Sequence, residues 1–238
     1  RPAGHHADFH GPSGFCLVNS LALSAKQLLG AGCERILIVD WDIHHGDGTQ
    51  KVFIDDPRVL FISLHRHDHR TFPFDNSSGE PCVVGSGDGA GFSVNIAWPD
   101  PGMGDAEYLY AFEKVVKPLA ALWQPQMVLV SAGFDAAEGD PIGDCNVSSS
   151  AFGHMTRSLM QYAGGKLLLA LEGGYSLAQV SECATACVRA LLGDEPTAAE
   201  REALETHPPA MCCDSARQAV DTTLQAHSAY WPALQRLS

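Results

Sequence analysis

The segment from Asp40 to Gly48, Asp-Trp-Asp-Ile-His-His-Gly-Asp-Gly, carries three carboxylates and two imidazoles. Carboxylate and neutral imidazole groups are ligands that suit Zn²⁺. Asp42 and His44 are separated by one residue, a spacing from which both side chains can reach one ion where a strand end flares. Asp135, from a distant segment, could add a third ligand and leave room for water, as a catalytic zinc requires. The pattern therefore predicts a metal site.

A second pair of adjacent histidines, His5 and His6, lies in a glycine-containing segment near the start of the chain. Imidazoles titrate near neutral pH, so such a pair can act as general base and general acid. That use requires a carboxylate on the far ring nitrogen, which fixes the tautomer and raises the basicity of the ring. Asp40 and Asp47 are the candidates. The alternative is a solvated histidine pair near a terminus, or the remnant of a tag.

Aromatic residues follow glycines at two further places. Tyr175 comes after Gly173 and Gly174, and its phenol could donate to a developing oxyanion. The alternative is a tyrosine that packs at a helix start. Phe15 follows Gly14, and Phe15 together with Phe72 or Phe74 could line an apolar slot. The alternative is that these phenylalanines are core or loop anchors.

These residues need elements that position them, and apolar runs alternate with helical patterns along the chain. We expect strands at 35–41, 58–65, 92–97, 127–131 and 166–171. We expect helices at 19–29, 49–54, 105–123 (capped by Asp105), 148–162, 177–192 and 215–231, with a loop at 193–209. Strands that alternate with helices predict a parallel sheet covered on both faces. The segment 66–91 is longer than most connections, which makes it a candidate functional loop.

The chemistry gathers where four of these strands end. Asp40, Ser63, Ser131 and Glu172 each follow directly on an apolar run. The carboxyl ends of parallel strands meet at one edge of the sheet, where such folds place their sites. This convergence predicts that the metal-ligand candidates and Tyr175 come together.

The composition fits one globular domain of 238 residues, with 45% hydrophobic and 18% charged residues. The net charge of −13 argues against direct nucleic-acid binding and favours lysine-rich partners, although it also fits a plain solubility role. Eight cysteines without a CxxC motif, and no visible signal sequence or membrane-spanning run, suit the reducing cytoplasm or nucleus. The first residue is not Met, so we expect a fragment that lacks its natural N-terminal part.

Taken together, these motifs resemble the zinc-dependent histone deacetylases over nearly the whole chain. The matching strings are Arg-Pro-x-Gly-His-His-Ala at 1–7, Gly-Phe-Cys at 14–16 with Asn19, Val39–Gly48, Ser-Leu-His at 63–65, Ala-Gly-Phe-Asp at 132–135, Gly-Asp-Pro at 139–141 and Glu-Gly-Gly-Tyr at 172–175. The Glu-Gly-Gly-Tyr string, Gly-Met-Gly-Asp at 102–105 and Leu-Leu-Gly-Asp at 191–194 look most like class IIb, and within it the second catalytic domain of the tubulin-type deacetylase. The resemblance implies a three-layer αβα fold of the arginase/deacetylase type, with residues 1–238 forming one N-terminally incomplete catalytic domain.

The resemblance also implies a role for each matching position. Zinc would be bound by Asp42, His44 and Asp135, and a monovalent cation, K⁺, by Asp40, Asp42, His44, Ser63 and Leu64. His5 and His6 would handle protons, supported by Asp40 and Asp47, and Tyr175 would hydrogen-bond the substrate carbonyl. Gly14, Phe15 and Phe72 would flank the acetyl-lysine stem, with Ile142 on the rim. The implied substrate is an acetylated protein such as a histone tail, tubulin or another lysine-rich segment, with neither nucleic acid nor membrane as a direct partner.

The chain departs from the family pattern at three positions. Ala3 replaces a Pro, Asp47 stands where class IIb often has Asn, and Pro73 occupies the place of a second Phe. The apolar Ile142 favours protein acetyl-lysine over acetylpolyamines, for which the polyamine-selective relative has Glu at this position. An arginase-type binuclear hydrolase is a competing hypothesis, which is disfavoured because Ala137 removes a bridging carboxylate. A catalytically inactive module that binds acetyl-lysine or a protein partner is a further one.

Overall fold

A computed structural model describes residues 2–74 and 77–236, so Arg1 of the first motif lies outside the described residues. Five parallel strands form one sheet in the order β3-β2-β1-β4-β5. The strands are β1 (Ile36–Asp40), β2 (Val59–Arg66), β3 (Ser93–Trp98), β4 (Met127–Ala132) and β5 (Leu167–Leu171). The predicted α/β fold with a parallel sheet is confirmed.

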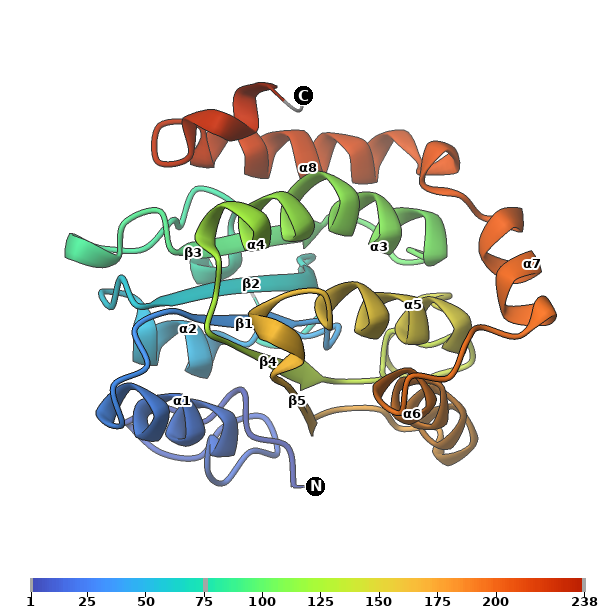
Figure 1. Cartoon of the computed structure of the whole chain (residues 1–238), viewed down its shortest axis with the longest axis horizontal. Coiled ribbons are helices and arrows are strands. Elements are labelled where there is room, and N and C mark those ends of the chain that lie inside the picture. Colours follow the sequence, from blue (N-terminus) through green and yellow to red (C-terminus); the bar gives the residue numbers. More distant parts are fainter. Residues whose placement is uncertain (1, 75–76, 237–238) are drawn as a thin grey trace.

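Helices cover both faces of this sheet (Figure 1). One face carries α1 (Ser20–Gly30) and α2 (Asp47–Phe53). The other side of the sheet carries α3 (Asp105–Ala111), the π-helical turn η3 (Phe112–Val116), α4 (Lys117–Trp123), α5 (Ser149–Leu159), α6 (Leu177–Leu191) and α8 (Asp214–His227). Helix α7 (Ala198–Thr206) packs beside α5. Short 3₁₀ turns lie at Ser77–Gly79, Gly87–Gly89, Ala163–Gly165, Pro209–Met211 and Pro232–Arg236.

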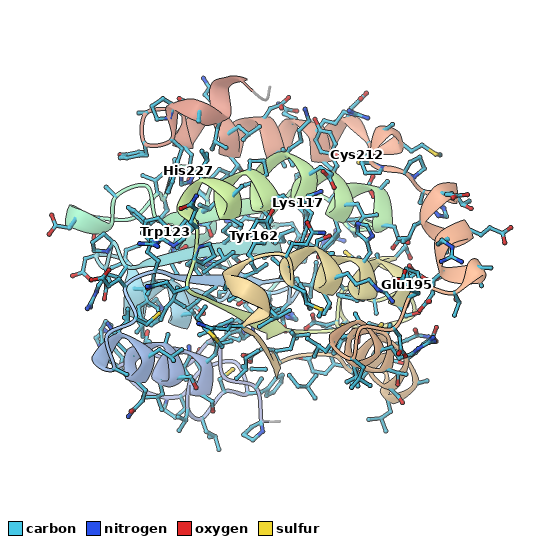
Figure 2. All side chains as sticks on the ribbon, viewed as in Figure 1. Lys117, Trp123, Tyr162, Glu195, Cys212 and His227 are labelled. Carbon is cyan, nitrogen blue, oxygen red and sulfur yellow. The ribbon has the colours of Figure 1, made fainter. Side chains whose placement is uncertain are left out.

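The central strand β1 shows why the fold has three layers. Its side chains alternate, so Ile36 and Ile38 enter the core formed with α1 and α2, while Leu37 and Val39 enter the core on the opposite face. All of β1 is buried, which is the reason that its sequence is a continuous apolar run. On the larger side, the Tyr162 hydroxyl donates to the Lys117 carbonyl at 3.1 Å and joins the turn after α5 to the start of α4 (Figure 2).

The strand register brings the functional strand ends together. Asp40 at the end of β1 pairs with Ser63 of β2 on one side and with Ser131 of β4 on the other. Leu171, the last residue of β5, pairs with Ala132 of β4. Segments that are distant in sequence therefore leave the sheet side by side at its carboxyl edge.

Two local predictions were wrong. The segment 193–209 contains helix α7, because Thr197 and Glu200 form a reciprocal capping box: the Thr197 hydroxyl accepts from the Glu200 N–H at 3.2 Å, and the Glu200 carboxylate accepts from the Thr197 N–H at 2.6 Å. Asp105 does not cap its own helix, since Gly104 is the N-cap; its carboxylate instead accepts from the N–H and hydroxyl of Ser148, each at 2.6 Å.

Among the described residues, we find no helix with the length and apolar character needed to span a bilayer.

Candidate metal and proton-transfer site

The metal-ligand candidates meet at the carboxyl edge of the sheet. Ligand-type atoms of Asp42, His44 and Asp135 all lie within 4.8 Å of one another, and all three residues are buried. Nδ1 of His44 lies 3.1 Å from Asp42 Oδ1 and 3.0 Å from Asp135 Oδ2. The structure thus brings together the three residues that the sequence singled out, two from the loop after β1 and one from the loop after β4.

This group of side chains is electrostatically suited to a cation. Burial opposes protonation of His44, but hydrogen bonds to Asp135 and Asp42 outweigh it and raise the pKa of this imidazole to about 10. The carboxyl of Asp42 keeps its charge although it is buried, because His5 and His44 hold its pKa well below the usual range. The two carboxylates that hold a proton on His44 supply the negative charge that a divalent ion would neutralise. The donor set, two carboxylates and one imidazole, fits Zn²⁺.

Backbone groups fix the orientation of both aspartates. Asp42 Oδ2 accepts from the Gly173 N–H at 2.8 Å, and Asp135 Oδ1 accepts from the Ile43 N–H at 2.9 Å. The carboxylates approach closely because Gly173 has no side chain: a Cβ there would lie 2.6 Å from Asp42 Oδ2 and even closer to Asp135 Oδ2. A Cβ on Gly133 would meet the carboxyl carbon of Asp42 at 2.5 Å. The two glycines therefore make room for the ligand carboxylates.

The histidine pair lies directly beside this group, with its rings 4.0 Å apart. Nδ1 of His5 lies 2.9 Å from Asp40 Oδ2, and Nδ1 of His6 lies 2.8 Å from Asp47 Oδ1. Both rings are buried, so neither is a solvated histidine near a terminus. Each ring therefore has the carboxylate partner that sequence reasoning required of a proton-transfer pair.

The two histidines differ in their affinity for a proton. Burial disfavours protonation of His5, but the charges of Asp40 and Asp42 outweigh it and raise its pKa well above the usual value. Burial and the adjacent His5 ring lower the pKa of His6 to about 4, although the hydrogen bond that its ring donates to Asp47 acts in the opposite direction. Burial would raise the pKa of Asp47, but hydrogen bonds with His6 and Lys51 lower it to about 2. Opposed affinities in neighbouring groups are the signature of an acid and a base.

Glu172 holds the backbone of the histidine pair, a contact that sequence reasoning missed. Its carboxylate accepts from the Gly4 N–H at 2.5 Å and from the His5 N–H at 3.2 Å. His5, Cys16 and Glu172 also offer three ligand-type atoms close together. The Glu172 carboxylate is already bonded to those amides, and Cys16 Sγ lies 3.4 Å from both the His6 N–H and the Gly14 carbonyl. We interpret this second group as the support of the histidine pair.

Aromatic rings surround the approach to the site. Phe72 packs edge-on against His6 with centroids 4.8 Å apart, and Tyr175 lies 6.5 Å from both His44 and Phe15. A Cβ on Gly14 would lie 2.8 Å from the Phe72 ring, so Gly14 lets that ring approach the histidines. Between Phe72 and Phe74, the structure places Phe72 at the histidines, whereas Phe74 is 63% exposed.

The mouth of the site is open. Phe15 is 82% exposed with a positive φ of 65°, and Ile142 is 48% exposed. A cavity of about 510 Å³ reaches from His44 to this rim and is lined there by Phe72, Phe74 and Ile142. The first part of the long 66–91 segment, residues 66–74, therefore borders the site.

The residues predicted to bind a monovalent cation lie beneath the same edge. Ser63 and Leu64 of β2 are fully buried, and Ser63 is the register partner of Asp40. The Ser63 hydroxyl lies 2.9 Å from Nδ1 of His65. The main-chain N–H of Asp42 donates to Asp40 Oδ1 at 3.2 Å, which ties the two aspartates of this segment together.

Known proteins match the whole length of this chain. Residues 1–191 match the histone deacetylase domain family. The chain is 48% identical to histone deacetylase 7 of Homo sapiens, over all of this chain and 25% of that protein. It is 43% identical to histone deacetylase HDA1 of Candida albicans, over 99% of this chain and 28% of that protein. The crystal structure of the HDA15 HD domain is similar with a TM-score of 0.88 and 42% identity, over 99% of this chain and 62% of that one.

The chain thus spans roughly a quarter of the length of the curated relatives it matches. The match with the family model covers the histidine pair, the three clustered metal-ligand candidates and Tyr175. The chain belongs to the histone deacetylase domain family.

Proposed function

We propose that this chain catalyses the zinc-dependent hydrolysis of N6-acetyl-lysine in proteins, releasing lysine and acetate. The observation that carries the proposal is the convergence of Asp42, His44 and Asp135 beside a histidine pair in which each ring has its own carboxylate. Membership of the histone deacetylase domain family supports the same reaction class.

The three buried ligand candidates would hold the zinc ion. When bound, zinc supplies Lewis acidity toward a carbonyl and lowers the pKa of water toward ~7. Asp40, with Ser63 and Leu64 on the neighbouring strand, would contribute oxygen donors for K⁺. The buried carboxylate of Asp40 also keeps the His5 ring in a fixed orientation.

The histidine pair would carry the protons. His6, whose pKa is lowered to about 4, is neutral at physiological pH and can accept a proton from the attacking water. Its Nδ1 is occupied by Asp47, so its Nε2 is the nitrogen available for that proton. His5, whose pKa is raised well above the usual value, can carry a proton for the leaving amine.

Tyr175 would stabilise the transition state. Its ring lies 6.5 Å from that of His44, within reach of a substrate carbonyl held at the clustered ligands. Its hydroxyl would donate to the oxyanion that develops there. Phe15, Gly14 and Phe72 would enclose the aliphatic stem of acetyl-lysine, since they line the approach to the histidines.

The rim and the charge of the chain favour a protein substrate. Ile142 is exposed at the mouth and offers no negative charge to the second ammonium of a polyamine. The net charge of −13 suits lysine-rich segments such as histone tails or tubulin loops. Assignment to class IIb and to the tubulin-type second domain stays a prediction from the motifs. So do the cytoplasm as the site of action and the nucleus as a second compartment.

Activity and metal content together test the proposal. Purified protein should contain about one zinc per chain, deacetylate an acetyl-lysine peptide, lose that activity with a chelator and regain it with zinc. Two transition metals per chain would instead favour the arginase-type hydrolase. Peptide binding without turnover in the zinc-loaded protein would favour the inactive binding module. Faster turnover of acetylspermidine than of the peptide would favour a polyamine deacetylase.

A further inference from the structure

Asp140 lies outside the set of metal and proton-transfer residues, yet it joins two functional loops. Its carboxylate is buried, and each oxygen accepts from a different loop. Oδ1 accepts from the N–H groups of Ile142 at 2.9 Å and Gly143 at 3.1 Å. Oδ2 accepts from the N–H groups of Tyr175 at 2.6 Å and Ser176 at 3.3 Å. One carboxylate therefore fastens the rim loop to the loop that carries the phenol.

The Tyr175 loop needs such a support because glycines precede it. Gly173 is held at both ends, since its N–H donates to Asp42 at 2.8 Å and its carbonyl accepts from the Phe134 N–H at 3.0 Å. Gly174 follows with φ of +120°, a conformation that is accessible to glycine but does not restrict its backbone. Downstream of this hinge, the Asp140 carboxylate is the group that holds the Tyr175 N–H.

Asp140 is itself fixed relative to the ligand Asp135. Its N–H donates to the Ala137 carbonyl at 3.1 Å, within the same turn of chain that begins at Asp135. The Gly143 carbonyl of this loop accepts from the buried Arg66 at 3.1 Å. Ser176 is the N-cap of the 15-residue helix α6, so a negative charge at Asp140 is also favoured by the helix dipole. Asp140, which supports the Tyr175 backbone, is therefore held in a fixed position relative to the loop that supplies Asp135.

We infer that Asp140 is a positioning residue that sets the phenol of Tyr175 against the metal ligands and couples it to the rim at Ile142. This inference rests on the deacetylase function proposed above. The carboxylate acts through the Tyr175 backbone and does not touch the substrate. Its loss should impair the step that uses the phenol more than it impairs substrate binding.

Asp140→Asn tests the inference, because the amide keeps the size of the side chain but turns one acceptor into a donor that faces N–H groups. In the zinc-loaded full-length protein, kcat on an acetyl-lysine peptide should fall about 10–100-fold, with KM changed by less than about twofold. In a Tyr175→Phe background, the same substitution should change kcat by less than about twofold. An equal loss of kcat in both backgrounds would show that Asp140 does not act through the phenol.

Asp105→Asn is the matched control. Asp105 is also buried and accepts two hydrogen bonds, from the N–H and hydroxyl of Ser148, at the start of α5 and outside the site. This variant should lower the thermal midpoint but leave kcat within about twofold of the parent. A loss of kcat as large as that of Asp140→Asn would assign the effect to general destabilisation and overturn the inference.

Hydrogen–deuterium exchange supplies a readout that needs no turnover. The amides of Tyr175 and Ser176 should exchange faster in Asp140→Asn than in the parent, and at the parental rate in Asp105→Asn. Unchanged exchange in Asp140→Asn would overturn the inference even if the protein is an active deacetylase. If the parent protein has no deacetylase activity but Asp140→Asn still exchanges faster, the proposed function is wrong. The structural role of Asp140 in holding the Tyr175 loop would nevertheless be confirmed.

Discussion

The floor and the mouth of the site are built in opposite ways. We call the floor the buried group formed by Asp42, His44 and Asp135 with the histidine pair. The mouth is the rim formed by the exposed Phe15, Phe74 and Ile142 together with the half-buried Phe72. The three ligand candidates of the floor follow the ends of β1 and β4, two parallel strands that each pair with two neighbours. The mouth stands on loops, where Phe15 takes a positive φ of 65° with most of its ring in solvent.

This difference suggests that the floor carries the chemical reaction and that the mouth determines substrate selectivity. Each carboxylate and imidazole of the floor has a hydrogen-bond partner, so a change there disturbs several groups at once. The exposed side chains at the mouth are apolar, so substitutions there should change the free energy of unfolding only slightly. Substitutions should therefore have effects that decrease from the floor outward.

The largest effect should follow from removal of a metal ligand. Asp135→Asn keeps the shape of the side chain but removes one of the two negative charges around His44. We expect zinc content to fall far below one per chain and kcat/KM to fall more than the ~10³-fold upper range for a single oxyanion donor. Metal analysis beside a peptide assay checks this, with Asp221→Asn on the surface of α8 as the control. Full zinc content in Asp135→Asn would show that Asp135 is not a metal ligand.

Tyr175→Phe should have the next largest effect. Loss of one oxyanion donor lowers kcat by about 10²–10³-fold, and zinc content should stay at the parental value because the phenol is not a ligand. Steady-state kinetics and metal analysis on the same preparation measure both. A variant with parental kcat would show that the phenol takes no part in the reaction.

Asp47→Asn should weaken His6 as a base. Because the Asp47 carboxylate raises the pKa of His6, its removal should lower that pKa and move the rising limb of the kcat/KM profile to lower pH. The rate at neutral pH should fall about 10–100-fold, as expected when the carboxylate partner of a functional imidazole is lost. Asp8→Asn is the control, since Asp8 also pairs with Lys51 but not with His6. A limb that moves to higher pH would assign the proton transfer to another group.

The smallest effect should come from the rim. Ile142→Glu places a carboxylate at the exposed mouth, where an ion pair with a polyamine ammonium contributes about 0–1 kcal/mol. The preference for acetylspermidine over a peptide should rise by no more than about fivefold, and kcat on the peptide should change little. Competition between the two substrates measures the ratio, with Ile142→Ala as the uncharged control. A change in kcat as large as that of Asp47→Asn would abolish the distinction between floor and mouth.

The sequence predicted the floor better than its supports. Strand ends such as Asp40–His44 combine an apolar run with metal-binding residue types, so periodicity and chemistry pointed to the same edge. The sequence assigns no contact to Asp140 or Glu172, because both accept hydrogen bonds from backbone N–H groups and no sequence pattern identifies those partners. The positions of Phe72 and Phe74 are likewise decided by the fold, because these two phenylalanines flank Pro73 and are chemically equivalent in the sequence.

Helix α7 is a different kind of omission. The Thr-x-x-Glu spacing at Thr197 and Glu200 was available in the sequence, but the surrounding Pro and Glu residues favoured a loop. Its capping signal outweighed the local composition. Boundaries elsewhere moved by up to four residues: the last helix, expected at 215–231, ends at His227, and β1 ends at Asp40 and leaves Trp41 to begin the loop.

The bare α-carbon of Gly173 restricts how this protein can diversify. Any side chain there would collide with both ligand carboxylates, whereas Ile142 on the rim is half exposed and has room for larger or smaller replacements. A library that randomises residues 142 and 173 together should consequently yield functional clones with glycine at 173 and variety at 142. New specificities in this scaffold would then be obtained from the rim loops, with glycine kept at position 173.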